Sequence, residues 1–173
     1  MSIRGVIFFF SSALLLLSTS MWINVEHDPE WKKYQKRYYK EHALQTEKKY
    51  TAATSEEEKE SLGRELAFLK NPVYEVKQIL LKGKALWSEG ENGDRVDRCM
   101  TCHLGINRED SISEEQPFSS HPRWEVYLGN HPPETFGCAL CHEGQARAMT
   151  NHEKAHGEVK HWLTPMNRGK LAQ

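Results

Sequence analysis

Two short stretches, RCMTCH at residues 98–103 and GCALCH at residues 137–142, follow one design. Each has two cysteines three positions apart, with a histidine directly after the second cysteine. In a helical turn, residues three apart lie on the same face, and the next residue projects from the same end. Each stretch therefore presents two thiols and one imidazole together.

This spacing is the signature of covalent attachment of c-type haem. The two thiols bond to the two vinyl groups of the porphyrin, and the imidazole reaches the iron. We therefore expect two covalently bound haem c groups in this chain. The expected attachment residues are Cys99, Cys102, Cys138 and Cys141, with His103 and His142 as proximal iron ligands.

Four cysteines have two other common uses. They form two disulfides in many exported chains, and paired Cys-x-x-Cys units form zinc ribbons. Neither alternative accounts for a histidine behind both pairs. The gap of about 35 residues between the pairs also exceeds the usual zinc-ribbon spacing.

The N-terminal run GVIFFFSSALLLLSTSMWINV, residues 5–25, carries no charge. A helix of about 21 residues spans about 31 Å, enough to cross a bilayer. Arg4 on the inner side and Trp22 at the outer interface favour an anchor that spans residues 1–26 and is retained in the mature protein. The alternative is a cleaved signal, for which Ser18-Thr19-Ser20 offers a poor cleavage site.

Both interpretations of the N-terminus place the rest of the chain outside the cytoplasm. Covalent haem attachment suits the periplasm of a bacterium, so we expect a single-pass protein of the inner membrane with its haems in the periplasm. The chain has 23 basic and 24 acidic residues. This balance gives no indication of nucleic-acid binding.

Residues 27–72 predict a helical spacer. One helix is expected at 28–50, where Asp-Pro-Glu begins an unbroken and highly charged run. A second is expected at 55–70, where Ser55 and Glu58 form a capping box. The apolar stripe on the first helix is thin, so a solvated face and a partner-facing face both stay open. Its charge makes us expect contact with a partner rather than with its own haem segment.

Residues 73–173 form the expected dihaem cytochrome c domain. A short amphipathic helix is predicted at 73–82, and beyond Trp87 runs such as EGENGDR and NHPPETFG predict loops. The haems supply much of the interior, together with Phe118, Trp124, Tyr127, Phe136 and Trp162. The expected fold class is mostly α, with an N-terminal transmembrane helix, a helical spacer and a small loop-rich haem domain.

The segment His152-Glu153-Lys154-Ala155-His156 matches H-E-x-x-H, the zinc-binding helix of metalloproteases. The context argues against a protease, because Gly157 and His161 do not fall where the extended motif needs them. The chain that remains is also too short for a substrate cleft. We expect no catalytic residues, and these histidines are available to haem iron.

A haem that serves electron transfer alone needs a second axial ligand on its iron. Our candidates for this distal ligand are His121, His131 and His156. His121 and His131 each precede a proline, which restrains the backbone. His156 is expected to fold back over the haem of His142. The other candidates are Met149 and Met166 as thioethers, Met166 being the main rival, and His152 and His161, which are expected to be exposed.

The order VDRCMTCHLGI, PFSSHP, YLGNHPPETFGCALCHEGQARA, AHG and HWLTPM closely resembles a family of membrane-associated multihaem c-type cytochromes. DPEWKKYQ and VYEVKQI look like that family's entry helices. The resemblance implies an exported redox subunit that accompanies cytochrome b-type, quinol-oxidising or other respiratory complexes. The sequence has Gln145-Ala146-Arg147 where relatives more often carry Gln-Gly-Arg, and it stops at Gln173 where longer relatives continue to further haem sites.

The function expected from the sequence is electron transfer, and not an enzyme activity. We expect a membrane-anchored dihaem cytochrome that passes electrons between redox centres of a respiratory complex. Its partners would be other redox subunits, of the cytochrome b type or with further c-type haems, and no small-molecule substrate is expected. The alternatives are a soluble periplasmic shuttle, a dihaem peroxidase or reductase with an open iron site, and a scaffold whose haems are mainly structural.

Overall fold

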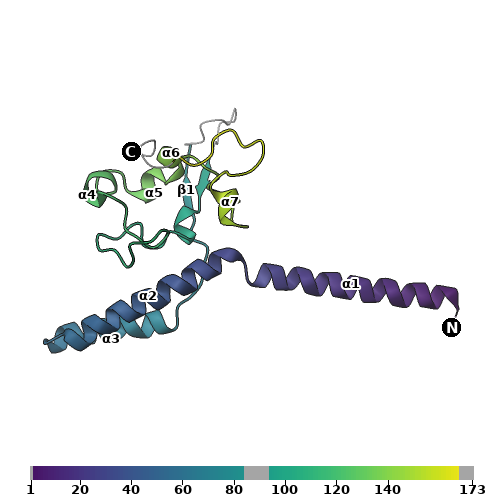
Figure 1. Cartoon of the computed structure of the whole chain (residues 1–173), viewed down its shortest axis with the longest axis horizontal. Helices are drawn as coiled ribbons and strands as arrows, with labels where there is room; N and C mark the ends of the chain where they lie inside the picture. Colours follow the sequence, from purple (N-terminus) through teal and green to yellow (C-terminus); the bar gives the residue numbers. More distant parts are fainter. Residues whose placement is uncertain (1, 84–93, 168–173) are drawn as a thin grey trace.

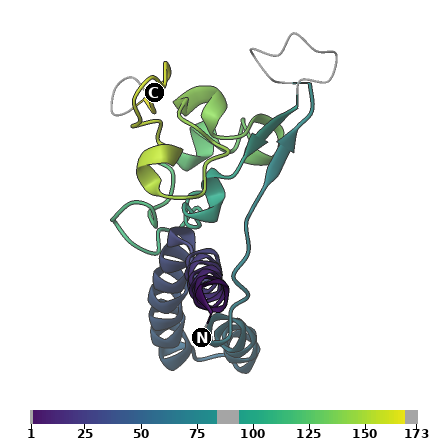
Figure 2. The same cartoon turned by 90° about the vertical axis from the view of Figure 1, so that its right-hand side faces the viewer.

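The computed structural model describes residues 2–83 and 94–167. Two long helices, α1 (Ile3–His27) and α2 (Glu30–Ala52), follow each other in one general direction (Figure 1). Helix α3 (Glu56–Lys70) returns beside α2. The rest of the chain gathers on one side of α2 (Figure 2), and α1 projects away from it (Figure 1).

The elements of the gathered segment are short. They are β1 (Ile79–Leu81), β2 (Arg95–Asp97), the 3-10 turn η1 (Cys99–Thr101), α4 (Trp124–Tyr127), α5 (Pro133–Phe136), α6 (Ala139–His142) and α7 (His152–Ala155). The two strands pair antiparallel, with Ile79 opposite Asp97. The chain is therefore mostly helical with a long apolar N-terminal helix, as the sequence predicted.

Helix α1 is 25 residues long, and none of its residues is buried. Its polar side chains bond to carbonyls of their own helix: Ser18 and Thr19 both donate to Leu15 O, at 2.9 and 2.7 Å. The lipid interior holds no water, so polar groups there must form their hydrogen bonds within the protein. The helix is long and apolar enough to cross a membrane, and a signal sequence has the same properties.

The helix boundaries follow the local signals closely. Asp28 ends α1 and Pro29 is the N-cap of α2, one residue later than predicted. The Asp28 carboxylate instead accepts a hydrogen bond from Lys36, whose charge lowers the pKa of Asp28. The cap predicted at Ser55 is confirmed, because its hydroxyl accepts the N–H of Glu58 at 3.4 Å.

The inner face of α2 packs against its own chain. Trp31, Tyr38 and Tyr39 are at most 9% exposed. The main core contains Tyr38, Tyr39, Leu69, Leu104, Ile112 and Phe118. The expectation that this helix avoids its own haem segment is therefore wrong. Its charged residues occupy the outer faces, and the inner face supplies aromatic rings that bury a large apolar area.

Gln35 of α2 is hydrogen-bonded to the first cysteine motif. Its side chain is fully buried, and Nε2 donates to Glu75 O at 2.7 Å and to Thr101 O at 3.0 Å. Its Oε1 accepts the N–H of Glu75 at 3.1 Å. Every hydrogen bond joins α2 to a distant part of the sequence. Gln35 thus fixes α2 against η1.

The prediction of a helix at 73–82 is wrong. Residues 73–78 form neither helix nor strand, and β1 begins at Ile79. The N–H and C=O of Lys77 both bond to the hydroxyl of Thr101, each at 3.0 Å, so they are not available to a helix. The loop predicted in EGENGDR lies almost wholly outside the described residues.

Candidate functional site

The two cysteine motifs adopt the same backbone turn. In the first, the N–H groups of Cys102 and His103 donate to Cys99 O at 3.2 and 3.0 Å. In the second, Cys141 and His142 donate to Cys138 O at the same two distances. This confirms the predicted helical turn in both motifs. All four cysteines are free thiols.

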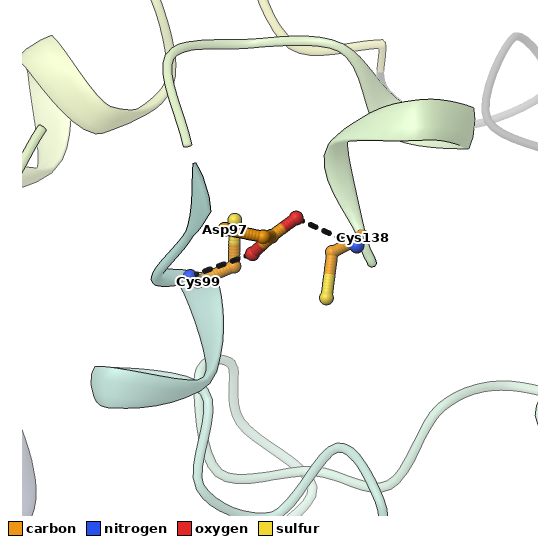
Figure 3. Close-up of side chains that lie close together, drawn as sticks. All are labelled: Asp97, Cys99 and Cys138. Carbon is orange, nitrogen blue, oxygen red and sulfur yellow. Dashed lines mark hydrogen bonds between the residues drawn. The ribbon is translucent and has the colours of Figure 1, made fainter. Parts of the chain in front are cut away.

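A single carboxylate joins the starts of both turns (Figure 3). Asp97 ends β2 and is fully buried. Its Oδ1 accepts the N–H of Cys99 at 3.0 Å, and its Oδ2 accepts the N–H groups of Cys138 and Ala139 at 2.7 and 2.9 Å. A carboxylate oxygen of Asp97 and the sulfurs of Cys99 and Cys138 lie within 4.8 Å of one another.

Further hydrogen bonds hold the two turns together. Arg95 of β2 donates from Nη2 to Ala139 O in the second turn, at 2.7 Å. Arg98, directly before the first turn, donates from its backbone N–H to Ala146 O at 3.0 Å and from Nη1 to Arg147 O at 3.1 Å. The motifs, distant in sequence, therefore form one unit.

Gly137 permits the close approach of the second turn. Its φ is +67°, a conformation that L side chains rarely adopt. A Cβ at this position would lie 2.6 Å from Leu81 Cδ1 and 3.0 Å from Asp97 Oδ2. The glycine that precedes Cys138 is thus required both by its backbone angle and by the contact with Asp97.

Each motif histidine faces one of the candidate distal histidines. The ring centroids of His103 and His156 lie 6.2 Å apart, with an interplanar angle of 50°. Those of His142 and His121 lie 6.0 Å apart, at 68°. His156 thus faces His103, whereas the sequence led us to expect it over His142. The pairs join segments that are far apart in the sequence.

These separations match the space that one metal ion occupies between two imidazoles. A metal–nitrogen bond is about 2 Å long, and a ring centre lies about 1.1 Å behind its nitrogen, so two axial imidazoles have centroids about 6.2 Å apart. The rings of His152 and His156 are also 6.2 Å apart. Those two residues, however, are neighbours on one helical turn, where such a spacing follows from helix geometry.

Burial lowers the pKa of both motif histidines, which favours the neutral imidazole that binds a metal. Burial, followed by the proximity of His156, lowers the pKa of His103 to about 4. Burial and His121 lower the pKa of His142. His121 Nδ1 lies 2.8 Å from Pro122 O. A carbonyl only accepts, so Nδ1 is the ring nitrogen of His121 that donates in this contact.

The other candidates lie elsewhere. His131 is exposed, with its ring 5.1 Å from that of Phe136 and Nδ1 3.2 Å from Tyr127 O. His152 contacts Glu30 of α2 at 3.1 Å. The backbone N–H of Met166 donates to His156 O at 2.7 Å, so Met166 lies beside a facing pair. His161 is exposed, as expected.

Three important residues were not singled out from the sequence. They are Asp97, Gly137, and Gln116, whose side chain raises the pKa of His103 against the larger effect of burial. The position of Asp97 two residues before Cys99 is a recognisable signal, because Asp side chains often bond a backbone N–H two residues on. Nothing local indicates its second bond to Cys138.

The residues present fit haem better than the alternatives. Neither Cys102 nor Cys141 belongs to the cluster of Asp97, Cys99 and Cys138, so the four thiols do not converge as a zinc ribbon requires. The Asp97 cluster itself offers a metal ion only three ligands. Two of them are the first cysteines of the motifs, so such a metal would exclude haem attachment there.

Around the histidine pairs, several large side chains are only partly buried and two polar atoms lack a hydrogen-bond partner among the described residues. Of the aromatic residues expected in the interior, Phe118 is fully buried, whereas Trp162 is 38% exposed and the other three are half-buried. Ser120 Oγ and Trp124 Nε1, which flank His121, are buried without a hydrogen-bond partner among the described residues. A haem carries carboxylates that can accept from such donors.

Comparison with family models, with curated proteins and with solved structures finds no match to this chain.

Proposed function

We propose that this chain is a membrane-anchored dihaem c-type cytochrome that passes electrons between redox centres of a respiratory complex. The observation that carries the proposal is the double pairing of imidazoles. Each Cys-x-x-Cys-His turn presents its histidine to a second histidine, at a separation suited to one iron. The family resemblance stated above for the sequence supports the same class.

In this proposal the cysteines attach the haems and the histidines bind the iron. Cys99 and Cys102 would hold one haem, with His103 and His156 as axial ligands. Cys138 and Cys141 would hold the other, with His142 and His121. The bound haems supply one-electron oxidation and reduction. With two histidines available to each haem, neither iron would keep a position for a substrate, which would favour electron transfer over catalysis.

The location proposed is the bacterial inner membrane, with α1 as a single-pass anchor and the haems in the periplasm. Glu30, in the first turn of α2, accepts hydrogen bonds from Tyr34 at 2.9 Å and His152 at 3.1 Å. This contact keeps α7, and therefore His156, close to the point where α1 ends. The site thus lies near the expected membrane surface, where a cytochrome b-type or another c-type redox subunit can exchange electrons with it.

The decisive experiment is production in a host that attaches haem to exported proteins. We expect two covalent haems per chain by pyridine haemochrome assay, and one after replacing Cys138 and Cys141 by Ala. The reduced protein should not bind carbon monoxide. Rapid carbon monoxide binding would favour a dihaem peroxidase or reductase, and a haem-free chain containing zinc would refute the proposal.

A further inference from the structure

Asp97 is a buried carboxylate with an unusual set of partners. Its side chain contacts the N–H groups of Cys99, Cys138 and Ala139, and none of the ion pairs among the described residues includes it. A buried carboxylate is costly unless hydrogen bonds satisfy it. The three N–H groups provide these bonds, and they come from two motifs that are remote in sequence.

The two oxygens of Asp97 are divided between the motifs. Oδ1 accepts a hydrogen bond from the first turn, and Oδ2 accepts from the second. The sulfurs of Cys99 and Cys138 lie within 4.8 Å of each other beside the same carboxylate. If each sulfur carries a haem, the attachment points of the two haems are neighbours, and Asp97 lies between them.

We propose that Asp97 is a positioning residue that fixes the two haem-binding turns against each other and places one negative charge beside both haems. This inference rests on the proposed haem attachment. A nearby negative charge stabilises the more positive, oxidised iron, and the effect is strong where water is excluded. Asp97 should therefore lower both reduction potentials.

The first test is Asp97→Asn in the full-length holoprotein, followed by redox titration. Asn has nearly the same shape, but it is neutral and one of its two terminal groups is a donor that cannot accept the N–H of a turn. We expect both potentials to rise. The matched control is Asp94→Asn, which removes a charge from the same region but whose oxygen can still accept the N–H of Gly83; there we expect smaller shifts.

The second test separates position from charge. Gly137→Ala keeps the carboxylate but forces the second turn away from Asp97 and Leu81. We expect the potential and EPR signal of the haem at Cys138 to change, while those of the haem at Cys99 stay as they are. The two signals can be assigned from the separate variants His121→Ala and His156→Ala.

The outcomes distinguish this inference from the proposed function. A wild-type chain without covalent haem refutes the function itself. Two haems whose potentials are the same in Asp97→Asn and wild type refute only the role of Asp97. If Asp97→Asn does not load haem, Gly137→Ala decides: an equal change at both haems overturns the inference, and a change confined to the second haem supports it.

Discussion

His121 and His142 face each other at 6.0 Å between ring centroids, although one lies on a loop before α4 and the other ends α6. His103 and His156 repeat the arrangement at 6.2 Å. Both pairs combine a histidine of a Cys-x-x-Cys-His motif with a histidine outside those motifs. The two pairs make specific predictions about which side chain controls which iron.

Removing a distal histidine should leave one iron with an open position. We expect His121→Ala and His156→Ala each to convert one of two low-spin haems to high spin and to create carbon monoxide binding at that haem. Low-temperature EPR and visible spectra measure both effects. His131→Ala is the matched control, because His131 lies against Phe136, and it should stay low-spin. If His121→Ala and His156→Ala stay low-spin while Met166→Ala does not, the ligand assignment is wrong.

Replacing Gln35 should destabilise the fold around the first motif. Gln35→Leu removes the partner of the buried Thr101 O and of the part-buried N–H and C=O of Glu75, at an expected cost of about 2–4 kcal/mol. Thermal unfolding in detergent, followed by circular dichroism, measures the loss. Gln45→Leu is the control, since Gln45 makes a single half-buried bond to Ile112 O, and it should cost about 1 kcal/mol. Equal effects would contradict the special role of Gln35.

His42 should make stability depend on pH. Burial lowers its pKa, and it outweighs the opposing Glu65, whose partly exposed carboxylate lies 3.1 Å away. The unfolded histidine titrates near pH 6.5. Below that pH the unfolded chain binds a proton that the folded chain does not, so stability falls as the pH drops from about 6.5 toward the folded pKa. His42→Gln should flatten this slope, measured by unfolding at several pH values. A slope equal to that of the wild type would refute the assignment.

The N-terminal helix should be retained in the mature protein. The intact mass should include residues 2–27 together with two haems, and the protein should remain in the membrane fraction after a high-salt wash. Salt weakens surface electrostatic attachment but not an apolar span. A mature mass that lacks residues up to about Ser20 would show that the segment is a cleaved signal.

The parts of the fold that the sequence predicted well depend on local signals. Ser55 and Asn71-Pro72 mark the two ends of α3, and each acts through neighbouring residues. The inner face of α2 was missed because it contains polar residues. Gln35, His42 and Thr46 recur at helical spacing with its aromatics, and their burial depends on partners far along the chain. The residues at 73–82 have helical apolar spacing, but Gln35 bonds the backbone of Glu75 and Thr101 bonds that of Lys77.

In the candidate site, too, the features that depend on neighbouring residues were predicted and those that depend on distant residues were not. The Cys-x-x-Cys-His turns are local, so their geometry followed directly from spacing. The candidate distal histidines were named from the sequence, but their partners were not settled, because ring pairing depends on how the loops fold. His156 lies far from His103 in the sequence, and long-range contacts such as the hydrogen bonds of Gln145 to Ala155 and of Met166 to His156 hold its segment in place.

The four facing histidines are nested in chain order. His121 and His142 lie wholly inside the interval that His103 and His156 define. Bringing the inner pair together closes a short loop of chain. Bringing the outer pair together closes a longer loop, at a greater entropic cost. A chain shortened after the second motif would keep both inner ligands and yet deprive the first motif of its partner. If the proposed ligands are right, synthesis from the N-terminus would deliver the first attachment site early and its second ligand, His156, last.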